Sequence, residues 1–119
     1  MLLQPFMHSV AQQGEISLCV IGGQVTHAVR KTPKPGDFRV QDDHGGSVHP
    51  YWAEPEEIRF AEKAVAACAV PPQYARVDMV RDPAGRLRLM ELELIEPELF
   101  LRFNPLAARL LAAEIAAIF

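Results

Sequence analysis

The feature that most limits what this chain can fold into is a pair of alternating segments in its second half. Apolar and polar side chains alternate over residues 74–81 and again over residues 87–95, and Asp-Pro-Ala-Gly lies between them at 82–85. Such alternation is typical of strands with one buried face, and the intervening residues are typical of a turn. The sequence therefore predicts two antiparallel strands that are neighbours in a sheet.

The rest of the chain divides into further strands and helices. Strand patterns cover residues 2–7, 16–21 and 24–30, and a glycine pair at 22–23 joins the last two. Helical patterns follow: one begins at Glu54-Pro55 and ends before Pro71-Pro72, and one begins at Pro105 with Asn104 as its cap. The order predicts an α+β domain that has a mainly antiparallel sheet and two helices.

The same patterns predict which side chains face the core. Three residues should share one face of the strand after the glycine pair: Val25, His27 and Val29. Four residues should begin the buried side of the last helix: Leu106, Leu110, Leu111 and Ala113. Residues 31–53 show no period, so this stretch is predicted to be a long loop, a kind that is usually functional or disordered.

Composition and charge exclude several classes of protein. The chain has 119 residues, enough for one small domain, and its formal net charge of -3 offers no basic face for nucleic acid. No apolar stretch approaches the ~20 residues of a membrane span, and the first residues lack the pattern of a signal peptide. Cys19 and Cys68 lie in apolar runs without motif spacing, so they are predicted to be unpaired, as in a reducing, cytoplasmic environment.

Three carboxylates are predicted to meet on one face of the paired strands. A short turn centred on residues 84–85 places Asp78 across from Glu91, and Arg76 across from Glu93. Two like charges ~4 Å apart repel by about 4 kcal/mol at an effective dielectric constant near 20, so something must offset the repulsion. Two interpretations stay open: a bound divalent cation such as magnesium, or a solvated face on which Arg76 neutralises Glu93 and the other two carboxylates point into water.

These strands also resemble those of a known family. Val-Asp-Met-Val at 77–80, followed by Leu-Met-Glu-Leu-Glu-Leu-Ile-Glu-Pro at 89–97, resembles the metal-binding strands of the ATP-grasp enzymes, most closely the glutathione-synthetase-like branch. The resemblance implies that Asp78, Glu91 and Glu93 hold two magnesium ions against the phosphates of ATP. Glu93 stands where this branch usually has asparagine, and Glu96 where a small residue is common.

The resemblance extends upstream and covers residue 4 to about residue 101. Gln4-Pro5-Phe6 resembles the end of the hinge strand beside adenine, and Gly14-Glu15-Ile16-Ser17 resembles the motif that places an acidic residue near the ribose. Residues 27–33, 36–41 and 45–46 resemble the loop over the phosphates, in which Lys31 and Arg39 match basic positions. Within the superfamily, the chain looks most like ligases related to the cyclo-ligase of cycloserine biosynthesis.

Each of these upstream residues also has a plain structural interpretation. Gln4 would be an exposed strand residue, Glu15 a turn residue without a ligand, and Lys31 a solvated lysine at a sheet edge. Arg39 would pair with a nearby aspartate. His27, in its strand, is expected to be a structural histidine with its hydrogen bonds satisfied.

The family implies an ATP-dependent carboxylate–amine ligase with ATP and Mg²⁺ as cofactors. Such an enzyme transfers the γ-phosphoryl group to a small-molecule carboxylate, and an amine then attacks the acyl phosphate. By the resemblance, Arg39 and Lys31 would serve catalysis, and Gln4, Glu15 and Lys31 would contact the nucleotide.

A complete ligase of this family resembles the chain only in its last third. Residues 1–119 are therefore expected to form a C-terminal ATP-grasp subdomain that lacks the preceding domain and the ATP lid and is inactive alone. The chain would be a piece of a longer protein, a shortened reading frame, or a subunit that meets its other half in trans. Uncovered apolar surface would favour a homodimer through the sheet or a strand edge. The alternative is a non-catalytic α+β interaction or assembly domain derived from such a ligase.

Overall fold

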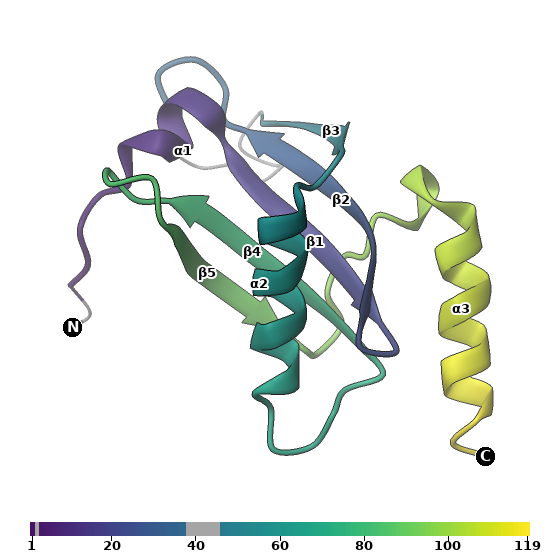
Figure 1. The fold of residues 1–119 in the computed structure, drawn as a ribbon. Helices are drawn as coiled ribbons and strands as arrows, with labels where there is room; N and C mark the ends of the chain where they lie inside the picture. Colours follow the sequence, from purple (N-terminus) through teal and green to yellow (C-terminus); the bar gives the residue numbers. More distant parts are fainter. Residues whose placement is uncertain (2, 38–45) are drawn as a thin grey trace.

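The fold is a single antiparallel sheet with helices on both faces. The computed structural model describes residue 1, residues 3–37 and residues 46–119. The strands of this part of the chain form one sheet in the order β3-β2-β1-β4-β5 (Figure 1). Their bounds are β1 Glu15–Ile21, β2 Gln24–Thr32, β3 Ser47–Tyr51, β4 Tyr74–Arg81 and β5 Leu87–Glu93. The helices are α1 His8–Gln13, α2 Pro55–Ala66 and α3 Pro105–Ala116, with a short 3-10 helix, η2, at Leu101–Phe103. The predicted α+β class is confirmed.

Helix α2 covers one face of the sheet and buries the main core. Alternate residues of β1 and β4 point toward the helix and pack against its Ala61 and Val65. These strand residues are Ile16, Leu18, Val20, Val77 and Met79. Strand β1 lies at the centre of the sheet, so all seven of its residues are buried. This arrangement explains why the segment has an almost unbroken apolar sequence rather than an alternating one.

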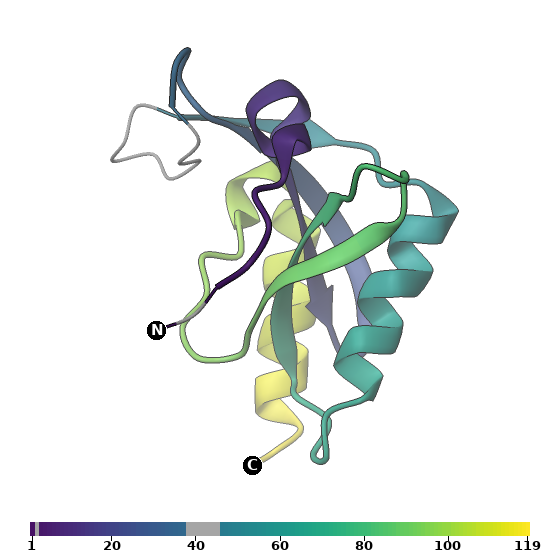
Figure 2. The same cartoon turned by 90° about the vertical axis from the view of Figure 1, so that its left-hand side faces the viewer.

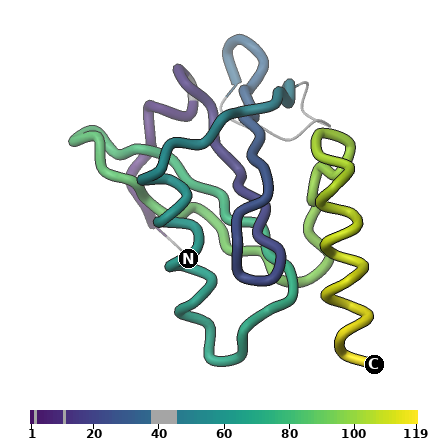
Figure 3. Tube along the Cα trace, turned by 45° about the vertical axis from the view of Figure 1, so that its right-hand side comes forward, coloured from purple at the N-terminus to yellow at the C-terminus, as the bar shows by residue number. Residues whose placement is uncertain are grey.

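The opposite face of the sheet is covered by the segment after β5 and by α3, as Figure 2 shows. A second, smaller apolar cluster forms there from Cys19, Val29, Leu99 and Phe100. Figure 3 shows α3 running beside the β1–β2 hairpin. The side chain of Glu114, on this helix, lies against Gly22 of the hairpin turn. The polar residues of the candidate site lie on this same face, next to the second cluster.

Local sequence signals explain where α2 begins. Pro55 occupies the first turn, and the Glu57 carboxylate accepts a hydrogen bond from the backbone N–H of Glu54 at 2.8 Å. The Tyr51 hydroxyl donates to the same carboxylate at 2.9 Å, which ties the helix to β3. The predicted start of the helix is confirmed, and the helix ends at Ala66, before the proline pair.

The N-terminal half departs from the predictions in two places. Residues 3–7, in the described part of the predicted strand 2–7, form no strand, and the helix α1 follows them. The predicted loop over 31–53 contains β3, and its first two residues belong to β2. Strand β3 was missed because it contains Pro50, a residue that edge strands accept and central strands do not.

A β-bulge overturns the predicted faces of β2. The register with β1 slips between His27 and Val25, which leaves Thr26 as the extra residue. Val25 therefore packs on the α2 side of the sheet with Ala28, whereas Val29 joins the second cluster on the other side. Strict alternation had placed Val25 and Val29 on one face, and that prediction is wrong.

Helix α3 begins at the predicted residue, but its buried side differs. Ala107 is buried and Leu111 packs on the second cluster, whereas Leu106 and Leu110 are 65% and 52% exposed. The Asn104 side chain does not cap the helix; its amide donates to the Thr26 carbonyl at 3.0 Å. A helix rich in Leu and Ala has no polar face to mark its orientation, so its packing could not be inferred from periodicity.

Two further expectations concern cysteines and membranes. Cys19 and Cys68 are both free, as predicted, although Cys68 is only half-buried. Among the helices in the described part of the chain, none combines the length and the apolar character that crossing a bilayer requires.

Candidate functional site

The register between β4 and β5 is the one predicted from the turn. Asp78 pairs with Glu91, and Arg76 pairs with Glu93. The side chains of Arg76 and Asp78 point away from α2, because Val77 and Met79 between and beside them belong to the main core. Three carboxylates and one guanidinium therefore share one face of two neighbouring strands.

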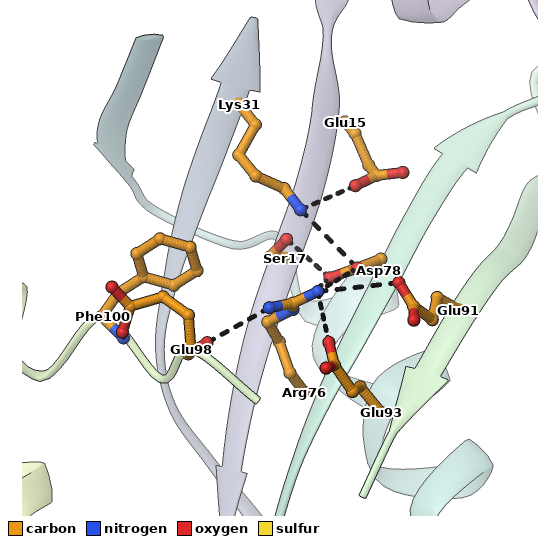
Figure 4. A network of polar contacts seen from close by, with 9 residues as sticks. All are labelled: Glu15, Ser17, Lys31, Arg76, Asp78, Glu91, Glu93, Glu98 and Phe100. Carbon is orange, nitrogen blue, oxygen red and sulfur yellow. Dashed lines mark hydrogen bonds and ion pairs between the residues drawn. The ribbon is translucent and has the colours of Figure 1, made fainter. Parts of the chain in front are cut away.

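Arg76 lies at the centre of these carboxylates, as Figure 4 shows. Its Nε and Nη2 donate to the two oxygens of Asp78, each at 2.9 Å. Nη2 also lies 2.7 Å from the Glu93 carboxylate and 3.7 Å from that of Glu91. Nη1 donates to the Glu98 carbonyl oxygen at 3.4 Å. The guanidinium thus offsets the repulsion that the predicted register creates.

Residues of β1 and β2 complete the cluster from the other side of Asp78. The Ser17 hydroxyl donates to Asp78 Oδ1 at 2.6 Å, because the two residues are cross-strand partners. Lys31 Nζ lies 2.8 Å from Glu15 Oε1 and 3.6 Å from Asp78 Oδ2. Lys31 and Glu15 are themselves directly opposed between β2 and β1. Four strands therefore contribute to one row of polar side chains across the sheet.

Burial separates the members of the cluster into two kinds. Asp78 is 1% exposed, whereas the Glu91 side chain is 57% exposed and that of Glu93 is 31% exposed. The interpretation as a solvated face holds for Glu91 and for the pairing of Arg76 with Glu93, and it is wrong for Asp78. Lys31 is 8% exposed, so it is not a solvated edge lysine.

Burial and charge also shift two pKa values in the cluster. Burial raises the pKa of Glu15 above its ordinary value, and the ammonium of Lys31 offsets this only in part. Burial by itself would lower the pKa of Arg76, but the hydrogen bonds and charges of Asp78, Glu93 and Glu91 outweigh it and raise that pKa. Arg76 is therefore a permanent cation at the centre of the site.

The donor chemistry of the site fits magnesium. Asp78, Glu91 and Glu93 offer only carboxylate oxygens, the ligands that this ion prefers, and they lie on one face of adjacent strands. Within the described ranges, however, no three carboxylate, imidazole or thiolate side chains converge in the manner of a metal site. Instead, Arg76 Nη2 lies among the three carboxylates, 2.9 Å from Asp78, 2.7 Å from Glu93 and 3.7 Å from Glu91.

One of the predicted residues that the structure describes lies apart from this cluster. Gln4 is exposed and lines a cavity of about 500 Å³ between the N-terminal segment and β5, together with Phe6, Leu89 and Met90. Met90 directly precedes Glu91, so the cavity lies along the same strand as the acidic end of the cluster. Arg39 lies outside the described residues.

Sequence reasoning assigned no role to Ser17 and treated Arg76 only as a neutralising neighbour of Glu93. The sequence contains a signal for both residues, because Ser17 is two residues after Glu15 and Arg76 is two residues before Asp78. A spacing of two puts each pair on one face of its strand.

His27 is a structural histidine as expected: its ring contacts Thr26 Oγ1 at 2.8 Å and the Leu99 carbonyl at 2.8 Å.

The chain is similar to several known proteins over most of its length. Residues 1–95 match the family model described as the RimK-like ATP-grasp domain. The cycloserine biosynthesis protein DcsG of Streptomyces lavendulae is 33% identical over 117 residues, covering 87% of this chain and 37% of DcsG. A probable alpha-L-glutamate ligase of Parasynechococcus marenigrum (strain WH8102) is 34% identical over 89 residues, covering 75% of this chain and 18% of that protein. The chain thus spans less than half the length of these relatives.

Two solved structures have a similar fold. The crystal structure of D-cycloserine synthetase DcsG matches 96% of this chain and 41% of its own, with a TM-score of 0.81 and 29% identity. The ATP-grasp ligase PsnB, complexed with a phosphomimetic variant of its minimal precursor, Mg and ADP, matches 86% of this chain and 32% of its own, with a TM-score of 0.61 and 20% identity. The predicted resemblance to the cycloserine-biosynthesis branch is confirmed by the similarity to DcsG. The chain therefore belongs to the RimK-like ATP-grasp family.

Proposed function

We propose that residues 1–119 are the C-terminal subdomain of an ATP-dependent carboxylate–amine ligase that works through an acyl phosphate. The observation that most supports this proposal is the row of charged side chains on β1, β2, β4 and β5. In that row Asp78 lies opposite Glu91, with Arg76 and Lys31 in contact with Asp78. A site for phosphoryl transfer needs both anionic ligands for a metal and fixed cations for the phosphates.

In this proposal Asp78, Glu91 and Glu93 hold magnesium beside the phosphates of ATP. The bound ion supplies positive charge that offsets the charge of the phosphates and fixes their orientation. Ser17 contributes indirectly, because its hydroxyl orients the Asp78 carboxylate at 2.6 Å. The exposed Glu91 and the half-buried Glu93 are proposed to lie on the side that a nucleotide can reach.

Lys31 and Arg39 are the proposed catalytic cations. An ammonium group has three N–H donors, and among the described residues Lys31 Nζ pairs with Glu15 at 2.8 Å and with Asp78 at 3.6 Å. In this proposal a further donor of Lys31 binds the γ-phosphoryl group while the bond to ADP breaks and a bond to the substrate carboxylate oxygen forms. The amine substrate then attacks the acyl carbon, and phosphate leaves. Both cations act by stabilising charge on the phosphoryl oxygens.

The proposed position of the nucleotide base is the cavity of about 500 Å³ beside β5. Phe6, Leu89 and Met90 give it apolar surface, at 52%, 46% and 38% exposure, and Gln4 adds an amide. Side chains of this kind suit a planar base with hydrogen-bonding edges. Glu15, near the other end of the cluster, is proposed to lie toward the ribose and to position Lys31.

The activity of the isolated chain belongs to the proposal as well. The ligases to which it is similar are longer, so the remaining wall of the ATP cleft would come from a further segment or from a partner in trans. We expect weak nucleotide binding and no turnover without that partner. A cytoplasmic location is part of the proposal and rests on the two free cysteines.

The test is a calorimetric titration of magnesium together with a non-hydrolysable ATP analogue. The useful variant is Glu91→Gln, because the side chain is 57% exposed and its loss should leave the fold intact. Glu56→Gln is a matched control, since Glu56 is also 57% exposed and also pairs with an arginine, on the α2 side of the sheet. We expect magnesium-dependent heat in the unmodified chain and in the control, and its loss in Glu91→Gln. Equal heat in all three proteins would refute the proposed metal site.

A second candidate function is a non-catalytic assembly domain derived from such a ligase. The observation that favours it is the exposed apolar surface of α3, where Leu106 and Leu110 are more than half exposed. This alternative predicts no magnesium-dependent heat in any of the three proteins, together with self-association or capture of a second polypeptide. The same titration therefore separates the two candidates.

A further inference from the structure

Arg76 has more contacts with the acidic cluster than with the rest of the protein. Four of its five polar contacts are to carboxylates: two to Asp78 and one each to Glu93 and Glu91. The fifth, from Nη1 to the Glu98 carbonyl oxygen, is long at 3.4 Å. The position of the guanidinium is thus determined mainly by the negative charge around it.

Asp78 has no oxygen left for another cation while Arg76 is in this position. Its Oδ1 accepts hydrogen bonds from Ser17 and from Arg76 Nε, at 2.6 and 2.9 Å. Its Oδ2 accepts from Arg76 Nη2 at 2.9 Å and lies 3.6 Å from Lys31 Nζ. A metal ion that binds Asp78 must therefore replace at least one of these donors.

The guanidinium is the group that can leave. Asp78 is short and is held on β4 between core residues, so its carboxylate cannot move far from the sheet. Arg76 has a long side chain, and its terminal nitrogens lie next to Glu91 and Glu93, which are partly open to solvent. Rotation about its outer bonds would remove one hydrogen bond from each oxygen of Asp78 without moving the backbone, and would leave the contacts with Ser17 and Lys31 in place.

We propose that Arg76 is a tethered counterion that occupies the cation position among Asp78, Glu91 and Glu93, and that a divalent cation binds only by displacing it. This inference rests on the proposed function, because it takes those carboxylates as the metal ligands. It adds that metal loading moves a positive side chain out of the acidic cluster. The displaced guanidinium then becomes available to an anion outside the cluster, so metal binding and anion binding are coupled.

The competition has a measurable consequence for a variant that lacks the guanidinium. Arg76→Gln keeps most of the side-chain length and removes both the competing donor and its repulsion of a metal ion. We expect it to bind Mn²⁺ about tenfold more tightly than the unmodified chain. Without metal the variant should melt at a lower temperature, because Asp78 is left buried without its main partner. Saturating Mn²⁺ should restore most of that loss.

Arg81→Gln is the matched control for this experiment. Arg81 lies on the same strand and also contacts three carboxylates, those of Glu54, Glu56 and Glu57, but on the α2 side of the sheet. The substitution makes the same change in net charge away from the acidic cluster. We expect its Mn²⁺ affinity to equal that of the unmodified chain. If both variants bind Mn²⁺ more tightly to the same degree, the loss of one positive charge explains the change in affinity and the proposal is refuted.

Calorimetry with Mn²⁺ alone, with folding checked by circular dichroism, distinguishes failure of the proposed competition from failure of the proposed metal site. If the unmodified chain binds Mn²⁺ and a folded Arg76→Gln binds it equally or more weakly, the competition is refuted and the metal site stands. If none of the proteins binds Mn²⁺, the metal site fails and the inference fails with it.

The unmodified chain provides a second test that needs no substitution. The Nε–H of Arg76 donates to Asp78 at 2.9 Å, so its nuclear magnetic resonance signal should be protected from solvent exchange without metal. Saturating Mg²⁺ should shift this signal and remove its protection. An unchanged Arg76 signal at saturation would overturn the proposal even if Arg76→Gln does not fold.

Discussion

Asp78 shows how one residue can link the fold to the site. It is 1% exposed, and its two oxygens contact Ser17, Arg76 and Lys31, each from a different position along the sheet. Removal of one partner from a buried ion pair is costly because the other charge is left without compensation. For that reason Asp78→Asn is a poor probe of metal binding, and the exposed Glu91 is a better one.

Cys19 and Cys68 should differ sharply in reactivity. Burial raises the pKa of the Cys19 thiol to about 12, and its Sγ donates to the Leu99 carbonyl at 3.1 Å. The thiolate is the reactive form, so Cys19 should stay inert even at pH 9. A thiol reagent such as Ellman's reagent should modify one cysteine, Cys68, in the native protein and both in denaturant. Rapid modification of both under native conditions would contradict the buried position of Cys19.

Asp82 should make the stability of the protein depend on pH in the acid range. Its carboxylate accepts the backbone N–H of Arg86 at 2.9 Å, which with Arg88 and Ala84 lowers its pKa from 3.8 to about 2. Because the folded-state pKa is depressed, the stabilisation is complete above pH 3.8 and is lost as the pH falls from 3.8 to about 2. Asp82→Asn should therefore lower the free energy of unfolding at pH 7.

The measurement is urea unfolding of both proteins at pH 7 and at pH 2. The difference between Asp82→Asn and the unmodified chain should shrink at pH 2, where Asp82 is about half protonated in the folded state and almost fully protonated in the unfolded state. A difference that keeps its full size at pH 2 would show that the charge of Asp82 does not stabilise the turn between β4 and β5.

At the scale of elements, Gly14 determines how α1 passes into β1. Its φ of 77° and ψ of -166° lie in a region that is essentially restricted to glycine. A Cβ at this position would also overlap the carbonyl oxygen of Lys31 on β2. The residue thus places Glu15 directly opposite Lys31 at the start of the sheet.

Gly14→Ala should lower the free energy of unfolding by roughly 3 kcal/mol, as the sum of backbone strain and overpacking. Gly23→Ala separates the two causes, because Gly23 has a φ of 82° but open space around it. That control should lose only about 1 kcal/mol. The comparison is made by chemical denaturation, and equal losses at the two sites would mean that the overlap with Lys31 is relieved without cost.

Among the elements, those predicted correctly have strong local signals. The pairing of Asp78 with Glu91 followed from two alternating segments and one short turn. The bulge at Thr26 had no such signal, because it depends on how β2 fits the twist of β1. Strand β3 was missed for a similar reason: an edge strand with Pro50 is stabilised by its neighbour and not by its own propensity.

At the scale of the whole molecule, α3 leaves an apolar surface uncovered. Leu106, Leu110 and Ile118 are 65%, 52% and 59% exposed, and the C-terminal Phe119 is fully exposed. Large exposed apolar patches are typical of interaction surfaces. The homodimer predicted from the sequence therefore stays a prediction, and α3 is an additional surface to test beside the sheet and its edges.

We expect light scattering at high micromolar concentration to show a species larger than a monomer. A double variant, Leu106→Glu with Leu110→Glu, should restore the monomer if α3 forms the contact, whereas Arg109→Glu, on the same helix, should not. A dimer that persists in the double variant would place the contact at the sheet or at a strand edge. A monomeric unmodified chain would rule out the homodimer.

The sequence by itself determined the class of fold, the β4–β5 pairing and the meeting of Asp78, Glu91 and Glu93, because these follow from side-chain alternation across one tight turn. Only the tertiary structure decided which cation lies among those carboxylates. Strands β1 and β2 bring Ser17 and Lys31 to Asp78 although they lie 61 and 47 positions away in the chain. No local pattern encodes such a meeting, since it depends on the order of strands in the sheet and on the volume left for each side chain.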